Sequence, residues 1–82
     1  MESNIQSSVA QAIEVQRVRS GISSQAELAR RAGYSPSALN KRLSGALRMD
    51  FTDVDRISRA LGVGPFDLLE AAKEERSLAR PA

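Results

Sequence analysis

Basic side chains are concentrated in residues 24–48 of this chain. The stretch carries five basic groups against one acidic group, Glu27, which gives a local charge of +4 in a chain whose net charge is +2. The basic residues are Arg30, Arg31, Lys41, Arg42 and Arg48. Guanidinium and ammonium groups gathered in this way attract phosphates, so the chemistry they suggest is electrostatic binding of a nucleic-acid backbone. A solvated helical face that happens to be basic is the alternative interpretation.

The residue types that catalysis and metal binding most often need are missing. The chain has no cysteine and no histidine, which excludes a disulfide, a zinc finger and the most common general base. No nucleophile–base pair can be assembled from the remaining side chains. We therefore expect no enzymatic activity, no metal and no cofactor. The apolar runs are too short to span a bilayer, and the first residues do not resemble a secretory signal.

Two short helices separated by a glycine must position the basic residues. Ser24 is a good N-cap for a helix over 25–32, and Glu27 stands three residues later, as in a capping box. Gly33 is expected to end this helix, because a turn so sharp needs a positive φ angle. Ser35 then caps a second helix over 36–43, with Pro36 at its first position. Helices this short must pack as an angled pair, so the pattern predicts a helix-turn-helix.

Three further helices are predicted around this pair, which makes the chain all-α. They run from Ser3 or Asn4 to Arg19, from Phe51 or Thr52 to Leu61 after an Asp50 cap, and from Pro65 or Phe66 onward. One domain is expected over 1–72, and the polar residues 73–82 are expected to fray. Apolar spacing assigns Phe51 to the inward side of its helix. The predicted core is Leu28, Ala29, Leu39, Leu43, Val54, Ile57, Leu61, Val63, Phe66 and Leu69.

The same residues resemble a known family. The matching positions are Ser24-Gln25, Leu28-Ala29, Ala32-Gly33-Tyr34-Ser35, Leu39, Ser44-Gly45, Ala60-Leu61-Gly62-Val63 and Leu68-Leu69. This pattern is similar to the lambda-repressor-like family, the Cro/repressor (XRE) group of bacterial and phage regulators. The resemblance covers about Val9 to Leu69 and implies a compact five-helix DNA-binding domain. In such a domain the second helix braces the DNA backbone and the third reads bases.

The resemblance also implies which residues contact bases. They are Pro36, Ser37, Asn40 and Lys41, on the first turns of the third helix. Pro36 departs from family members that carry glutamine there, and it can make only apolar contact, for instance with a thymine methyl. Ser37 discriminates weakly, Asn40 can pair with adenine, and Lys41 can donate to guanine. Each of these residues could instead be simply solvent-exposed or contact a phosphate.

DNA backbone contacts are expected at both ends of the motif. By resemblance, Gln25 holds a phosphate and buttresses the third helix, and a helix N-terminus favours an anion there. The full predicted set is Ser24, Gln25, Ser35, Arg42, Ser44 and Arg48. Arg30 and Arg31 reach the DNA backbone only if the rotation of their helix about its axis turns them toward it. Tyr34 lies in the turn, where packing is favoured over a phosphate contact.

The predicted function is that of a sequence-specific transcriptional regulator that binds double-stranded DNA. A phage or prophage repressor of the Cro type is favoured, with an antitoxin-type regulator or a protein-interaction module derived from the same fold as alternatives. The expected location is the cytoplasm of a bacterial host, on the nucleoid when bound, with no membrane partner. A homodimer through Leu68, Ala71, Ala72 and Leu78 of the last helix, a monomer and a DNA-assisted dimer all remain open.

Overall fold

The computed structural model describes the backbone of residues 5–79 and the side chains of residues 5–74. Within these residues the chain forms five α-helices and no strand. They are α1 (Ile5–Arg19), α2 (Gln25–Ala32), α3 (Pro36–Ser44), α4 (Phe51–Leu61) and α5 (Pro65–Ala79). The all-α, five-helix architecture predicted from the sequence is therefore confirmed.

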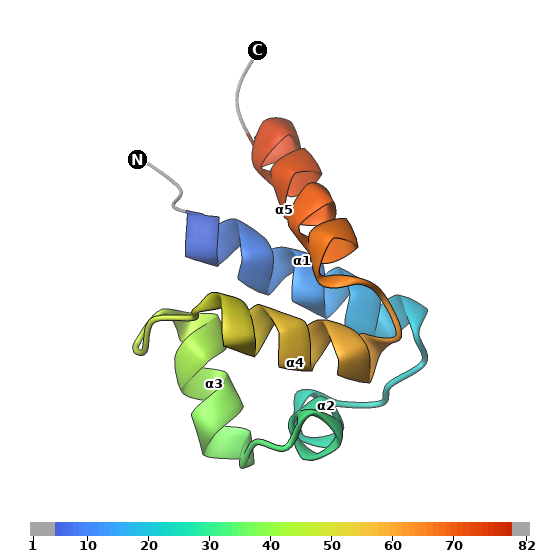
Figure 1. Cartoon of the computed structure of the whole chain (residues 1–82), viewed down its shortest axis with the longest axis vertical. Helices are drawn as coiled ribbons and strands as arrows, with labels where there is room; N and C mark the ends of the chain where they lie inside the picture. Colours follow the sequence, from blue (N-terminus) through green and yellow to red (C-terminus); the bar gives the residue numbers. More distant parts are fainter. Residues whose placement is uncertain (1–4, 80–82) are drawn as a thin grey trace.

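The helices form two groups that share one apolar core. Figure 1 shows α1 and α5 on one side of α4, and the α2–α3 pair on the other. α1 packs most extensively on α5 and least on α2. The largest apolar side chains that are almost completely buried come one from each helix: Ile13, Leu28, Leu39, Ile57 and Leu68. Burial of these side chains holds helices that are individually too short to be stable.

Local signals in the sequence define most helix boundaries. Ser24, Ser35 and Asp50 each accept a backbone N–H of the following helix through the side chain, as predicted. Asp50 also takes part in a full capping box, because the Asp53 carboxylate accepts the Asp50 N–H at 3.0 Å. Glu27 does not repeat this arrangement at α2, since its carboxylate is held by Arg30 and Arg31.

The phase of α5 differs from the prediction. Leu68 and Ala72 are buried, with 1% and 5% exposure, although the sequence had offered both as a dimer surface. Phe66 was predicted to lie in the core but is 72% exposed. It precedes Leu68 by two residues, which places it roughly 200° around the helix from the buried stripe. Leu78 lies outside the residues whose side chains are described.

Phe51 was also predicted to face inward, and it is 51% exposed. It is the first residue of α4 and precedes the buried Val54 by about one turn. At the other end of the chain, α5 continues beyond Ala72 to Ala79. The polar residues 73–79 are mostly good helix formers, and this explains why the helix continues through a stretch that was expected to fray. Residues 80–82 lie outside the described part of the chain.

Candidate nucleic-acid interface

The turn between α2 and α3 sets the angle of the pair. Gly33 has φ +83°, the left-handed conformation predicted for it. The N–H of Tyr34 donates to the carbonyl of Ala29 at 2.8 Å, and the N–H of Gly33 donates to that of Arg30 at 3.2 Å. These two bonds close the last turn of α2 in the manner of a left-handed cap. Ser35 then accepts the Ala38 N–H at 3.1 Å and caps α3, so only three residues separate the two helices.

One face of α3 is exposed and carries the residues expected to contact bases. Pro36, Ser37, Asn40 and Lys41 are all exposed, and they occupy an arc of roughly 140° on the helix. Leu39, on the opposite side, is completely buried and fixes the rotation of α3 about its axis. The structure therefore brings all four residues together on one accessible surface.

Asn40 is joined to the start of α2. Its side-chain Nδ2 donates to Oε1 of Gln25 at 3.3 Å. Gln25 is half-buried on the first turn of α2, next to the cap Ser24, and both Ser24 and the α3 cap Ser35 are exposed. Each cap hydroxyl uses its oxygen as an acceptor and keeps a proton that can be donated to a phosphate. The bond gives Asn40 a defined orientation and links the two helices across their exposed edge.

The far end of α3 is held by α1. Gln6 donates through Nε2 to the carbonyls of Arg42 at 2.9 Å and Leu47 at 2.6 Å. This bond fixes the loop that carries Arg48, whose side chain is exposed. The Ser44 hydroxyl donates to the Lys41 carbonyl at 3.2 Å, so its proton is already used at the end of α3. No motif in the sequence indicated this role for Gln6.

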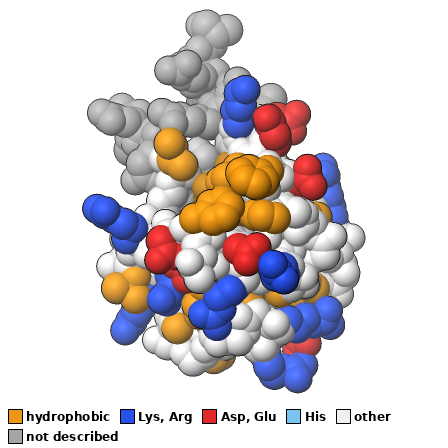
Figure 2. Space-filling model, in the orientation of Figure 1, with side chains coloured by type: hydrophobic (Ala, Val, Ile, Leu, Met, Phe, Trp, Pro, Cys, Tyr) orange, Lys and Arg blue, Asp and Glu red, His pale blue; other side chains and the backbone are white. Residues whose placement is uncertain are grey.

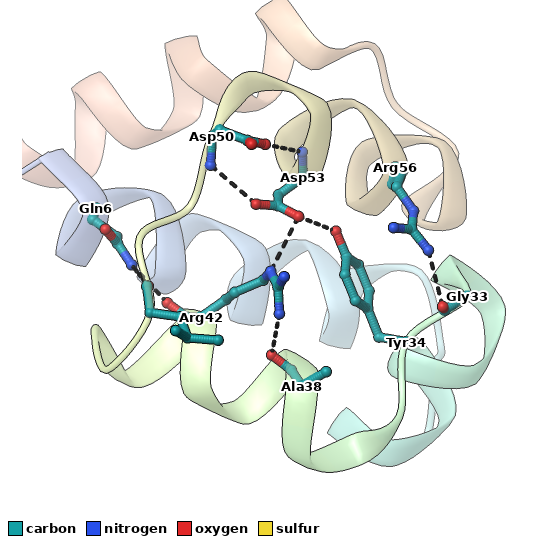
Figure 3. A network of polar contacts seen from close by, with 9 residues as sticks. Gln6, Gly33, Tyr34, Ala38, Arg42, Asp50, Asp53 and Arg56 are labelled. Atoms are coloured by element: carbon teal, nitrogen blue, oxygen red, sulfur yellow. Dashed lines mark hydrogen bonds and ion pairs between the residues drawn. The ribbon is translucent and has the colours of Figure 1, made fainter.

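Arg42 has partners within the protein. Its Nε donates to Asp53 at 3.1 Å, its Nη1 donates to the Ala38 carbonyl at 2.9 Å, and its guanidinium lies over the Tyr34 ring, 4.9 Å from the centroid (Figure 3). The side chain is only 23% exposed. Arg42 thus anchors α3 to α4, and the phosphate contact expected of it stays a prediction.

Tyr34 is packed at the centre of this network, as favoured from the sequence. It is 8% exposed, and its ring lies between Arg42 and Arg56, whose guanidinium carbon is 4.2 Å from the ring centroid. The phenol donates to Asp53, and Arg56 donates to the Gly33 carbonyl at 2.9 Å. Figure 3 shows how these contacts tie the turn to α4.

The protonation of the network follows from its burial and hydrogen bonds. Burial and the hydrogen bond to Asp53 raise the pKa of Tyr34 to about 12. Burial acts to raise the pKa of Asp53 as well, but hydrogen bonds from Tyr34 and the Asp50 N–H, with the charge of Arg42, hold that pKa below its ordinary value. Asp53 therefore stays ionised as the common acceptor. Sequence reasoning missed Asp53, although the Asp50-x-x-Asp53 spacing could have identified it as a capping partner.

Positive charge extends from α3 onto α2. Arg30 and Arg31 have side chains that are 76% and 52% exposed, and both pair with Glu27. Hydrogen bonds from these two arginines lower the pKa of Glu27, so it remains ionised and offsets part of their charge. Figure 2 shows Lys and Arg side chains gathered over the part of the molecule that α2 and α3 form in Figure 1. This surface is suited to a polyanion.

Two other kinds of site are absent from the described part of the chain. Among the side chains of residues 5–74, no group of three acidic or other ligating residues is placed to hold a metal ion. None of the helices in that range combines the length and apolar character needed to cross a bilayer.

Comparison with known proteins supports the interpretation of this surface. No curated protein and no solved structure matched the chain. A family model for the Cro/C1-type HTH DNA-binding domain matches residues 12–74, which include the whole of α2, α3 and α4. This match confirms the resemblance that the sequence motifs had indicated. The chain therefore belongs to the Cro/C1-type helix-turn-helix DNA-binding family.

Proposed function

We propose that this protein is a sequence-specific transcriptional regulator that inserts α3 into the major groove of an operator. The observation that carries the proposal is the exposed face of α3, where Pro36, Ser37, Asn40 and Lys41 lie together opposite the buried Leu39. An α-helix fits the major groove, and its exposed polar side chains then face the base edges. By occupying the operator the protein would block transcription, as phage or prophage repressors of the Cro type do. This role belongs on DNA in a bacterial cytoplasm.

Each residue of the exposed face has a distinct role in this proposal. Lys41 donates to guanine O6 and N7, and Ser37 makes one or two bonds without strong preference. Asn40 shares its amide with Gln25 at 3.3 Å, so its remaining hydrogen-bonding groups are presented to a base in one orientation. Pro36 contributes apolar contact only. The contacts to bases specify the site.

Contacts to the DNA backbone hold the domain in register. Ser24, Gln25 and Ser35 lie at the N-terminal ends of α2 and α3, where helix dipoles also favour phosphate. Arg48 lies beyond the other end of α3 in the loop fixed by Gln6. The two groups flank the base-reading face, as contacts to the backbones on either side of a groove would.

Two experiments test the proposal. The first selects the sequences that the protein binds from random DNA, and the second measures the affinity for a selected sequence across a series of salt concentrations. If each subunit engages about four to six phosphates, the slope of log affinity against log salt is roughly −4 to −5 for one subunit and about double for two. The selected sequences should share one short motif. A flat salt response, or selection that returns no motif, would overturn the proposed function.

A further inference from the structure

The loop between α3 and α4 is held by hydrogen bonds rather than by burial. Residues 44–48 are all exposed, so their side chains contribute little to the core. The backbone of Leu47 is nevertheless bonded on both sides. Its N–H donates to the Lys41 carbonyl at 3.0 Å, and its carbonyl accepts from Nε2 of Gln6 at 2.6 Å. A loop with so few apolar contacts opens easily unless such bonds hold it.

Gln6 joins this loop to the end of α3. Its Nε2 also donates to the Arg42 carbonyl at 2.9 Å, and Figure 3 shows the side chain reaching α3 from α1. The Arg42 carbonyl belongs to the last turn of α3, where carbonyl groups lack the usual helical partner. A single amide group therefore fixes the loop relative to the helix that carries the base-reading face.

We infer that Gln6 is a positioning residue for the contact between Arg48 and the DNA backbone. This inference rests on the proposed function, in which Arg48 binds a phosphate. Arg48 follows Leu47 directly, so the place of its backbone depends on the bond that Gln6 makes. Both bonds from Gln6 go to backbone carbonyls outside the base-reading face. Gln6 should therefore act on affinity and leave the choice of sequence unchanged.

The physical reason is the cost of ordering the loop. When Gln6 holds the loop, binding to a phosphate has to order only the side chain of Arg48. Without that bond, binding must order the loop backbone as well. Fixing the backbone of one residue lowers an affinity by about tenfold, so loss of the bond should weaken DNA binding by about three- to tenfold. The loss should be equal on every sequence, because phosphates are the same everywhere.

Gln6→Met tests the inference in the full chain. Methionine keeps the length of the side chain and suits a helix, but it has no N–H to donate. Gln16→Met is the matched control, because Gln16 is also a half-buried glutamine of α1 and lies roughly 15 Å farther along the helix. Affinities for the selected operator and for random DNA of equal length are measured for both variants. Gln6→Met should lower both affinities by the same factor, and the control should match the wild type.

A double-mutant cycle with Arg48→Ala separates positioning from a general effect on folding. In the Arg48→Ala background, Gln6→Met should change the affinity little, because the side chain that it positions is absent. A general loss of folded protein would instead weaken binding equally in both backgrounds.

Amide hydrogen exchange of the free protein measures the loop without DNA. In Gln6→Met the Leu47 N–H should exchange faster than in the wild type, because its bond to the Lys41 carbonyl is no longer supported from the other side of the residue. The amides of Val54 and Ile57 in α4 serve as the reference for global stability and should keep their wild-type rates.

Three results would overturn the inference. One is equal DNA affinities for Gln6→Met and Gln16→Met. Another is an equal loss from Gln6→Met with and without the Arg48 side chain. The third is a loss on the operator that exceeds the loss on random DNA, since Gln6 would then act on base reading. If the wild type still selects one motif and binds it with a steep salt response, any of these results rejects only this inference and leaves the proposed function intact.

Discussion

Replacing Tyr34 with phenylalanine should destabilise the protein by about 2 kcal/mol. The change keeps the ring and its stacking between Arg42 and Arg56, and it removes only the hydroxyl that donates to Asp53. A hydrogen bond to a charged group is worth about 1.5–3 kcal/mol. The rise in the pKa of Tyr34 from 10.0 to about 12 corresponds to about 2.7 kcal/mol, of which burial is the largest cause. The hydrogen bond therefore accounts for only part of that energy.

Chemical denaturation at neutral pH measures the effect, and the thermal midpoint should fall by roughly 8–16 °C. The pH dependence gives a second measurement. Because the folded state raises the pKa of Tyr34, its contribution is fully present below about pH 10 and is lost as the pH rises toward 12. The chain has a single tyrosine, so tyrosinate absorbance reports on Tyr34 alone. It should appear near pH 12 in the native protein and near pH 10 in denaturant.

A double-mutant cycle separates the hydrogen bond from other effects. Asp53→Asn, Tyr34→Phe and the double variant should show a coupling energy of about 1 kcal/mol or more. The reasoning would be refuted by a loss below about 0.5 kcal/mol for Tyr34→Phe, or by a native tyrosine that ionises near pH 10. Either result would mean that the phenol is not bound to a buried carboxylate.

Three further predictions concern the helix-turn-helix. Lys41→Ala and Ser37→Ala should each weaken binding to the best operator by about 1–3 kcal/mol, with Ser37→Ala at the lower end. Arg48→Ala should instead weaken binding to all DNA sequences alike and reduce the slope of log affinity against log salt by about one. The affinity of each variant for the operator and for random DNA of equal length distinguishes base contacts from phosphate contacts. If Lys41→Ala lowers both affinities equally, Lys41 contacts a phosphate. Gly33→Val should destabilise by more than about 1 kcal/mol and by more than Gly33→Asn, because φ is +83°; equal thermal midpoints would contradict the strain argument. Ala29→Leu should lower the free energy of unfolding, measured by urea titration, by about 1–3 kcal/mol, because Ala29 is fully buried between helices. An unchanged urea midpoint would mean that the core can accommodate the larger side chain.

The sequence alone determined where most helices begin and end. Ser24, Ser35 and Asp50 act on backbone groups three residues away, and Gly33 acts through its own φ angle. Such interactions are complete within one turn, so residue type and spacing are sufficient to predict them. The exposed face of α3 follows from the same local information, because the burial of Leu39 places the neighbouring polar residues outside.

Only the tertiary structure decided which long-range partners those helices have. Nothing near Arg42 in the sequence shows that its guanidinium meets Asp53, and nothing near Gln6 shows that it holds a loop 41 positions away. The phase of α5 was equally undetermined, because Phe66 and Leu69 form as good an apolar stripe as Leu68 and Ala72. Packing against α1 selected the second stripe and left Phe66 in solvent. Local periodicity shows that a helix has an apolar face, but the shape of the neighbouring helices determines which side chains fill the core.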